Sequence, residues 1–486
     1  YTDVDDKIIQ VALENREDPR AVAERFIAAY REDLGALACR APTVEPRVSE
    51  TIPEIIALIE ALIAKGSAYA TPEGDVYYDV ATFAEYGKLS KRKLAVQRSE
   101  FGRGKAGETK RGEHDFALWK AAKPHEPEGA RWPSPWDEGR PGGHIACPAM
   151  SHGHLGDHFD LHFGGQDLKF PHHENEIAQS EPVYGSPMAQ GWMHNGFIEM
   201  EIERNANFTP EVSALLPALK ESIADLTKIS KSDRRKLDEL RARDAQHLTA
   251  EDRALMAVYE RKVHFSEWFQ LRRLRERVDG EGIRLWILGT HYRAPLAFDL
   301  AEDPDGTIHF PAIEQSEKRA EYYYDTRAKL AAKRAQMAGS KAPGGKPSLQ
   351  KAFDELRQAF AQALDNDLNT AGALDPMNRI YQRVNELCDT KKPHPDDLQA
   401  AEDALAHVTR VTGVAEGSHE SFFARVTARR VKVRGIDPRA VDALVAERNA
   451  ARERKDFARA DAIRAELTAQ GIELRDGTQG TAWRAV

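Results

Sequence analysis

The stretch from Trp132 to Glu176 brings one cysteine, several histidines and several carboxylates into a short part of the chain. Cys147 follows a short apolar step, and Pro171 suits the first turn of a helix. A helix beginning there would place His172 and Glu176 on one face, because they stand at i and i+4. A thiolate, an imidazole and a carboxylate are three of the four ligands of a tetrahedral zinc site. The alternative is a helix start with a capping histidine, an exposed glutamate and a buried structural cysteine.

The composition is that of a globular protein with several domains. The chain has 486 residues, of which 41% are hydrophobic and 30% charged, and this length is enough for several cores. The apolar run IPEIIALIEALIA contains Glu54 and Glu60, so we expect neither a membrane span nor a signal peptide. The three cysteines, Cys39, Cys147 and Cys388, are too few for a disulfide framework, which favours a cytoplasmic location.

The charge of the chain gives no global attraction for nucleic acid. The formal net charge is −9, so any RNA-binding surface must be local. Basic runs at 228–236 and 425–434 are candidates, although such runs are usually solvated helix faces.

The strings GRPGGHIAC, AMS, FDLH, GGQDLKFPHHENEIAQSE and WMHNGF resemble the central signature of the cysteinyl-tRNA synthetases. The similarity extends from TDVDDKI at the start to DGTQGTAW at the end. It implies an α/β fold, with a class I Rossmann-type catalytic domain, a connective insertion, an α-helical bundle and a small C-terminal anticodon-binding domain. It also implies a cysteine–tRNA ligase, a monomer that activates cysteine with ATP and Mg²⁺ and transfers it to tRNA(Cys).

The resemblance implies one zinc ion held by two cysteines, a histidine and a glutamate. Cys147, His172 and Glu176 match three of these ligands, and the fourth belongs to a segment upstream of Tyr1. A thiol substrate binds zinc as a thiolate, whereas the hydroxyl of serine coordinates poorly. The resemblance therefore implies that cysteine is selected without a separate editing step.

The chain starts at Tyr1 inside a pattern that resembles the family's segment after its second Rossmann strand. The first strand, the first zinc cysteine and the HIGH-type ATP motif would then lie outside the sequence, which is either a fragment or a truncated gene model. We expect the chain as given to be inactive in forming cysteinyl adenylate.

Domain boundaries follow from the same resemblance. The expected parts are the catalytic domain at 1–50 and 141–300, the connective insertion at 51–140, a family-atypical insertion at 201–262, the stem-contact region and helical bundle at 301–415, and the anticodon-binding domain at 416–486. Periodicity predicts helices before residue 50 and from 349 to 414, and a helix that ends at Gly66. GDVYYDV predicts a strand, GGHIACPAM and HFDLHFGGQDL read as strand ends, and 340–348 reads as a flexible loop.

Three residues match family positions near the amino-acid pocket: Thr2, His162 and Asp167. On their own they could be an N-cap, a strand histidine and a turn aspartate. The sequence departs from the family at Gly143, where a tryptophan is usual, and at Ala146, where a glutamate is usual.

The ATP signature loop has two candidate positions. Lys228 to Ser232 spell KISKS, in which Lys231 would stabilise the ATP phosphates and Lys228 would support it. Aligning without a gap puts Glu260 to His264 there instead, with Lys262 as the lysine. We favour KISKS, because it matches the family's KMSKS-type loop at four of five positions inside the correct window. The remaining residues of this segment of about sixty would then be two flanking insertions, and a segment this long should have its own structure.

The last stretch resembles the family's anticodon-binding domain at Arg452, Phe457, Asp461 and Asp476. An arginine and an aromatic ring suit stacking on splayed bases, and aspartates accept hydrogen bonds from base edges. By itself, RERKDFARAD would pass for an exposed charged helix.

Two other functions compete with the tRNA ligase. One is a cysteine ligase with a small amino-sugar acceptor, and the match from about 440 to 483 argues against it. The other is a catalytically impaired relative that binds RNA or zinc, which the changes at Gly143 and Ala146 leave open.

Overall fold

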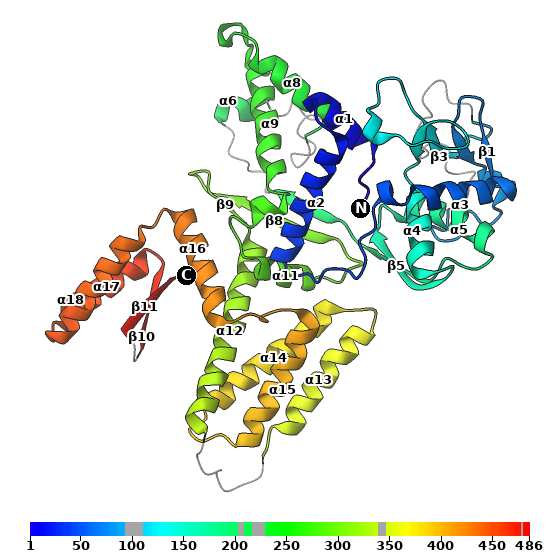
Figure 1. Ribbon diagram of the computed structural model, residues 1–486. Coiled ribbons are helices and arrows are strands. Elements are labelled where there is room, and N and C mark those ends of the chain that lie inside the picture. Colours follow the sequence, from blue (N-terminus) through cyan, green and yellow to red (C-terminus); the bar gives the residue numbers. More distant parts are fainter. Residues whose placement is uncertain (93–109, 203–208, 216–228, 339–346, 478–479) are drawn as a thin grey trace. The chain divides into compact units, whose positions relative to one another are not determined.

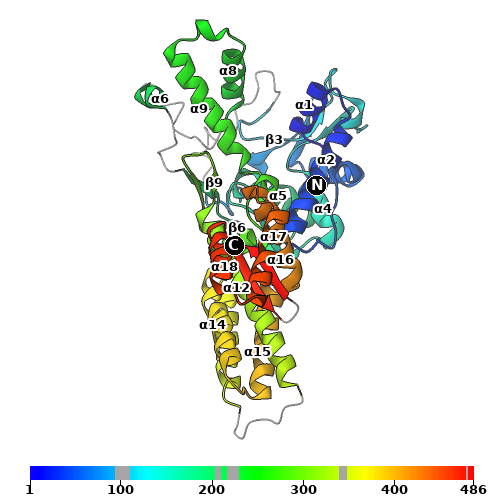
Figure 2. The same ribbon diagram turned by 90° about the vertical axis from the view of Figure 1, so that its left-hand side faces the viewer.

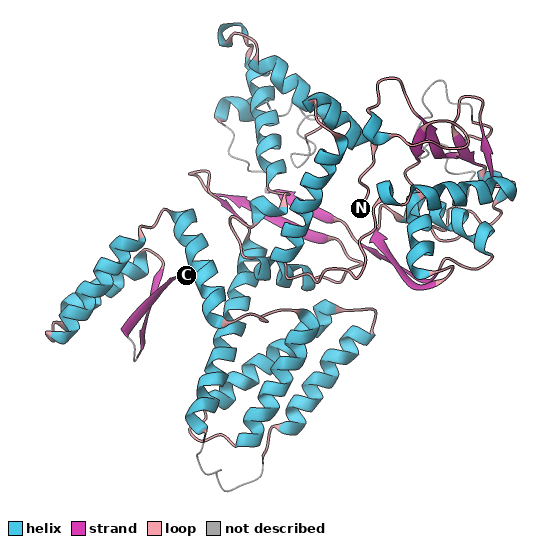
Figure 3. Ribbon diagram, viewed as in Figure 1, coloured by secondary structure: helices cyan, strands magenta, loops and turns pink. Residues whose placement is uncertain are grey.

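The computed structural model describes residues 1–486 except 93–109, 203–208, 216–228, 339–346 and 478–479. Contacts divide the chain into one unit of Tyr1–Phe197 with Arg293–Pro295 and a second of Ile198–Tyr292 with Leu296–Val486. Helices and short strands occur in both units (Figure 3). The division falls inside the catalytic domain expected at 141–300, and the boundaries drawn from the sequence stay predictions.

The first unit begins with two helices, α1 (Asp6–Asn15) and α2 (Pro19–Ala36), as expected before residue 50 (Figure 1). Asp5 and Asp18 cap them with carboxylates that accept backbone N–H groups. A short turn, η1 (Val48–Glu50), follows.

The next helix, α3 (Ile52–Ala64), packs with a small antiparallel sheet. The chain leaves α3 through Gly66, which has a φ of +75° that favours glycine. The sheet has the strand order β1-β2-β3-β4, and Tyr78 and Trp119 fill its core. The remaining elements here are β1 (Ala68–Ala70), β2 (Val76–Tyr78), η2 (Val80–Thr82), β3 (Phe116–Ala121), η4 (Glu128–Ala130) and β4 (Gly139–Pro141). β2 confirms the strand expected in GDVYYDV.

A parallel strand pair completes the first unit. β5 (Phe159–Gly165) and β6 (Ala189–Asn195) pair in parallel, and the chain between them contains η5 (Lys169–His173) and α5 (Glu174–Tyr184). This is a βαβ unit, the usual way of joining parallel strands. The strand end expected in HFDLHFGGQDL is confirmed, because β5 ends at Gly165.

The strand end expected in GGHIACPAM is wrong. β4 ends at Pro141, and α4 (Ala146–Leu155) begins within the motif. Ile145 and Ala149 stand at i and i+4, and both are buried in the same apolar cluster. This helical spacing buries one face of the segment, whereas an extended chain would turn alternate residues outward.

The second unit opens with a three-stranded sheet of order β7-β8-β9. β7 (Ile198–Ile202) and β8 (Leu296–Glu302) are parallel, and β9 (Ile308–His309) is antiparallel to β8. The helices between β7 and β8 in the sequence include α10 (Leu271–Leu274) and α11 (Gly280–Leu288).

The segment at 201–262 has its own structure, as its length requires. It contains α6 (Pro210–Leu215), α8 (Lys231–Arg241), η7 (Ala245–His247) and most of α9 (Ala250–Glu267). Small apolar clusters join α8 to α9 and α6 to α9. α9 lies beside both α8 and α6 in both views (Figures 1 and 2).

The long helices after residue 310 share one large core, which confirms the expected bundle. Tyr323, Phe360 and Tyr381 are fully buried in it. Its helices are α12 (Pro311–Met337), α13 (Gln350–Asp365), α14 (Thr370–Asp389), α15 (Pro395–Thr412) and α16 (His419–Arg434). The loop expected at 340–348 lies mostly outside the described residues.

The chain ends in α17 (Pro438–Glu453), α18 (Phe457–Ala469), β10 (Ile472–Gly477) and β11 (Gly480–Ala485). The two strands form an antiparallel hairpin, and the four elements enclose their own apolar cluster. RERKDFARAD is thus the end of one helix, a turn and the start of the next. Over the described ranges, no helix is long and apolar enough to cross a membrane.

Candidate functional site

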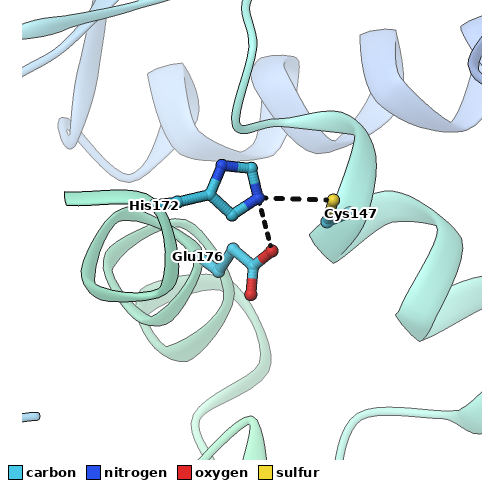
Figure 4. Close-up of side chains that lie close together, drawn as sticks. All are labelled: Cys147, His172 and Glu176. Carbon is cyan, nitrogen blue, oxygen red and sulfur yellow. Dashed lines mark hydrogen bonds and ion pairs between the residues drawn. The ribbon is translucent and has the colours of Figure 1, made fainter. Parts of the chain in front are cut away.

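Cys147, His172 and Glu176 converge in the first unit, as the sequence predicts (Figure 4). His172 Nε2 lies 3.6 Å from Cys147 Sγ and 3.1 Å from Glu176 Oε1. Cys147 comes from the first turn of α4, and Glu176 from the first turn of α5. Phe170 is extended, with φ −146° and ψ 131°, so the helical run that carries His172 and Glu176 begins at Pro171.

The distances from His172 Nε2 to the other two ligand atoms fit one tetrahedral metal ion. Bonds of about 2.3 Å to sulfur and about 2.0 Å to nitrogen and oxygen, at tetrahedral angles, put sulfur and nitrogen about 3.5 Å apart and nitrogen and oxygen about 3.3 Å apart. The separations in the structure are 3.6 Å and 3.1 Å. A thiol, an imidazole and a carboxylate are also ligands that zinc prefers.

Glu176 is a buried carboxylate, and one of its two oxygens has no hydrogen-bond partner among the described residues. Its side chain is 1% exposed, and Oε2 lies 2.9 Å from His162 Nε2. That approach lacks hydrogen-bond geometry, and Oε2 has no hydrogen-bond partner among the described residues. Burial would raise the pKa of Glu176, but the nearby rings of His162 and His172 outweigh burial and lower it to about 2. A buried, charged and incompletely bonded carboxylate is a suitable ligand for a cation.

The thiol beside it is protonated in the absence of a metal. Burial, together with the charge of Glu176, raises the pKa of the Cys147 thiol. Only the thiolate binds metals, so metal binding here releases a proton.

His144 holds the other nitrogen of His172, and the sequence reading missed it. The two Nδ1 atoms lie 2.8 Å apart, so one must donate and the other accept. Burial and the neighbouring His172 lower the pKa of His144 to about 4, so its ring is neutral near pH 7. Metal binding through Nε2 of His172 requires the proton on its Nδ1, which then donates to His144. The sequence signal was present, since His144 stands three residues before Cys147.

A second donor group shares Glu176 with the first. It consists of His162, His173 and Glu176. His173 Nδ1 already lies 2.9 Å from His194 Nε2, and a side-chain Cβ at Gly164 would come within 2.5 Å of the His173 ring. His173 is thus fixed against β5 and engaged with β6. Of the two groups, the one with Cys147 is better suited to zinc, because the distances from His172 fit a tetrahedral ion and the thiol is a strong zinc ligand.

The start of α5 is anchored by side chains that the sequence reading left without a role. Glu174 accepts hydrogen bonds from the backbone N–H groups of Gly87 and Ser90, at 2.9 and 2.8 Å. Asn175 accepts one from the hydroxyl of Tyr86. These bonds fix the first turn of α5 and therefore the position of Glu176.

The other residues expected at the amino-acid pocket are exposed. Thr2 lines an apolar hollow of about 400 Å³ beside α1 and α2, and Asp167 lies in the turn after β5. At Gly143, where the family usually has a tryptophan, an added Cβ would meet nothing within 4 Å. Ala146 is buried in the apolar cluster at the start of α4.

The two candidate signature loops differ in structure. Ser230 is the N-cap of α8 and Lys231 is its first residue, while Lys228 lies outside the described residues. The alternative from Glu260 to His264 lies inside α9, and Lys262 is only 5% exposed. A buried lysine in the middle of a helix does not form a phosphate-binding loop, and KISKS stays the predicted signature loop.

Arg452 and Asp476, two of the expected anticodon residues, form an ion pair of 3.0 Å. The buried Arg448 donates two hydrogen bonds to Asp476, at 2.8 and 2.9 Å, and no motif in the sequence pointed to it. Phe457 is 62% exposed at the first position of α18, and Asp461 lies four residues on. The exposed ring is suited to stacking on a base.

Two family models match the chain. One is described as tRNA synthetases class I (C) catalytic domain and matches residues 1–221. The other is the cysteinyl-tRNA ligase anticodon binding domain, at residues 438–484. The first covers the candidate metal centre and ends before KISKS.

Bacterial proteins named cysteine–tRNA ligase are similar along the whole chain. That of Anaeromyxobacter dehalogenans (strain 2CP-C) is 39% identical over 497 residues, covering 100% of this chain and 86% of that protein. That of Nitratidesulfovibrio vulgaris (strain Hildenborough) is 38% identical over 488 residues, covering 99% and 86%. A methionyl-tRNA synthetase structure from Mycobacterium tuberculosis covers 90% of this chain and 86% of its own, at 11% identity and a TM-score of 0.45. That score is too low to bear on the fold.

Proposed function

The chain belongs to the cysteine–tRNA ligases, and we propose that it selects cysteine with a zinc ion bound by Cys147, His172 and Glu176. The family match establishes a class I α/β catalytic domain and an anticodon-binding domain. The reaction is the ATP-dependent ligation of cysteine to tRNA, with ATP used together with Mg²⁺. The observation that supports zinc is that His172 Nε2 lies 3.6 Å from Cys147 Sγ and 3.1 Å from Glu176 Oε1, as ligands of a single tetrahedral ion do.

Zinc at this position would bind the thiolate of the substrate and so distinguish cysteine from serine. Different residues of the chain would bind the zinc ion and orient its ligands. His172 offers Nε2 while its Nδ1 is held by His144, and Glu176 offers Oε1 while His162 stands beside Oε2. A serine would offer the zinc a hydroxyl in place of the substrate's sulfur, and a site built for a specific atom rejects the analogue that lacks it. Thr2, His162 and Asp167 remain proposed as substrate-binding residues.

Activation joins the carboxylate of cysteine to the α-phosphate of ATP and releases pyrophosphate. We assign Lys231 to the developing phosphate charge and Lys228 to its support. The N-terminus of α8, where Lys231 stands, is also the end of a helix that favours anions.

The acceptor is proposed to be tRNA(Cys). The match to an anticodon-binding domain at residues 438–484 supports it over a small amino-sugar acceptor. Arg452, Phe457, Asp461 and Asp476 are proposed to contact the anticodon. Phe457 offers an exposed ring, and Arg452 can exchange its ion pair with Asp476 for contacts to RNA.

Metal analysis of the intact gene product tests the zinc proposal. We expect about one zinc per chain in the wild type and a large loss in Cys147→Ala. Cys39→Ala is the matched control, because Cys39 is an exposed free thiol, and it should keep its zinc. Equal zinc content in all three proteins would show that Cys147 is not a ligand.

A further inference from the structure

We propose that Lys262 is a positioning residue for adenylate formation, which holds the start of α8, and with it Lys231, through Asp233. The inference rests on the phosphate role proposed for Lys231. Lys262 would then position Lys231, whereas the alignment without a gap would have made Lys262 itself the lysine that stabilises the ATP phosphates.

The start of α8 is closed by a reciprocal capping box. The hydroxyl of Ser230 accepts the backbone N–H of Asp233 at 3.0 Å, and Asp233 Oδ2 accepts the backbone N–H of Ser230 at 3.1 Å. These two bonds satisfy donors that a helix start otherwise leaves open. Lys231 lies between the two capping residues, so its backbone position depends on the box.

Asp233 is held in turn by Lys262. The ammonium of Lys262 lies 3.3 Å from Oδ2, the same oxygen that accepts the Ser230 N–H. Lys262 is 5% exposed and comes from the middle of α9. A buried ammonium is costly without a charged partner, so the pair fixes the carboxylate relative to α9. Removing the ammonium would leave Asp233 without the charge that opposes its partial burial.

α9 is a rigid support for this contact. Leu237 and Leu240 of α8 are buried with Tyr259 of α9 in one apolar cluster. A second ion pair joins the same two helices, from Arg241 at the end of α8 to Glu260 at 3.1 Å. Both of its side chains are about half exposed. The chain therefore contains a buried pair at the start of α8 and an exposed one at its end, and these make a matched test.

The test measures cysteine-dependent exchange between pyrophosphate and ATP in the intact gene product, with zinc content followed in every variant. Lys231→Ala should lower kcat about a hundredfold or more. Lys262→Met should lower kcat about tenfold to a hundredfold, leave the KM for cysteine unchanged, and change kcat less than about twofold in the Lys231→Ala background. Lys262→Arg should restore most of the rate, and Glu260→Gln should resemble the wild type.

The outcomes separate the two ideas. If Lys231→Ala is fully active, the proposed role of Lys231 is wrong and the positioning role falls with it. If Lys231→Ala is impaired but Lys262→Met is harmless, or lowers kcat by the same factor in both backgrounds, Lys262 has no positioning role. Asp233→Asn serves if Lys262→Met does not fold, since it keeps an oxygen for the cap and removes the charge. It should reproduce the loss and the dependence on Lys231, and normal kcat in a folded Asp233→Asn protein would overturn the inference.

Discussion

Replacing His144 should weaken zinc binding, although His144 is not a ligand. His144→Ala removes the group 2.8 Å from Nδ1 of His172, and with it the bond that fixes the tautomer and the ring orientation. Loss of such a partner typically costs 10–100-fold in metal affinity, or about 1.4–2.7 kcal/mol. The His172 side chain is 20% exposed, so water can replace part of the bond. We therefore expect the lower end of the range, about tenfold.

The packing of His144 requires a second variant. Its ring meets the edge of Phe116, with centroids 6.0 Å apart, so His144→Ala also leaves a gap. His144→Phe fills the space but has no nitrogen. If the hydrogen bond matters, both variants lose zinc affinity, whereas a packing effect alone would spare His144→Phe.

Zinc affinity is measured by competition with a chelator of known affinity. His152→Ala is the control, because His152 lies on α4, stacks on Tyr184 and pairs with Asp157 at 2.9 Å. Wild-type affinity in both His144 variants, or an equal loss in His152→Ala, would refute the reasoning.

Two further predictions concern the second unit. In a filter-binding assay, Arg452→Ala should weaken tRNA binding about tenfold, while adenylate formation stays normal. The control is Arg439→Ala, at the other end of α17 and about 20 Å away along the helix, which should bind tRNA normally. Equal loss of both activities in Arg452→Ala would mean that Arg452 is structural. Asp325 of α12 accepts from His419 at 2.7 Å, Arg475 at 2.9 Å and Arg484 at 3.2 Å, and although burial opposes it, these partners hold its pKa below the usual value. Because the pKa of Asp325 is lowered in the folded state, its stabilisation is present above the unfolded pKa of about 3.9 and is lost as pH falls through the folded pKa. In urea unfolding, Asp325→Asn should therefore lower the free energy of unfolding by about 2 kcal/mol at pH 6 and by much less near pH 3. Asp389→Asn, at an exposed pair of 2.7 Å with Lys329, should have little effect at either pH, and a loss of stability in Asp325→Asn that does not change with pH would contradict the ionic explanation.

Local patterns predicted those elements whose burial follows a simple period. α3 and the bundle helices bury one face at helical spacing, and β2 is a short run of valine and tyrosine. The pairing of His172 with Glu176 was likewise readable, since a separation of four residues on a helix brings two side chains together. The convergence of Cys147 with them is a tertiary contact across 25 residues. The kinds of residue in this stretch suggested it alongside a structural alternative, and the family resemblance favoured it.

The failures share a physical cause. GGHIACPAM has a short apolar step that suits either a strand end or a helix start, and the cluster that buries Ile145 and Ala149 decides for the helix. His144, Arg448 and Lys262 each contact a residue that lies 28 or 29 positions away in the sequence. The closeness of His144 to Cys147 could have marked it as a candidate, but its partner, like those of the other two, could not be read from spacing. Partners of this kind are set by packing and leave no periodic signal.

His144, Arg448 and Lys262 have similar roles, which explains why the residues of the motifs alone do not describe the predicted sites. Each is partly or fully buried, and each holds a residue in or directly beside a predicted site. His144 holds the far nitrogen of His172, Arg448 holds Asp476 while Arg452 stays half exposed beside it, and Lys262 holds the carboxylate that caps α8. A group held at a second point loses less freedom when it binds its target, so part of the ordering cost has been met in folding. Changes at these partners should therefore alter affinity or rate while the residues proposed to contact the metal, the anticodon and the phosphates are unchanged.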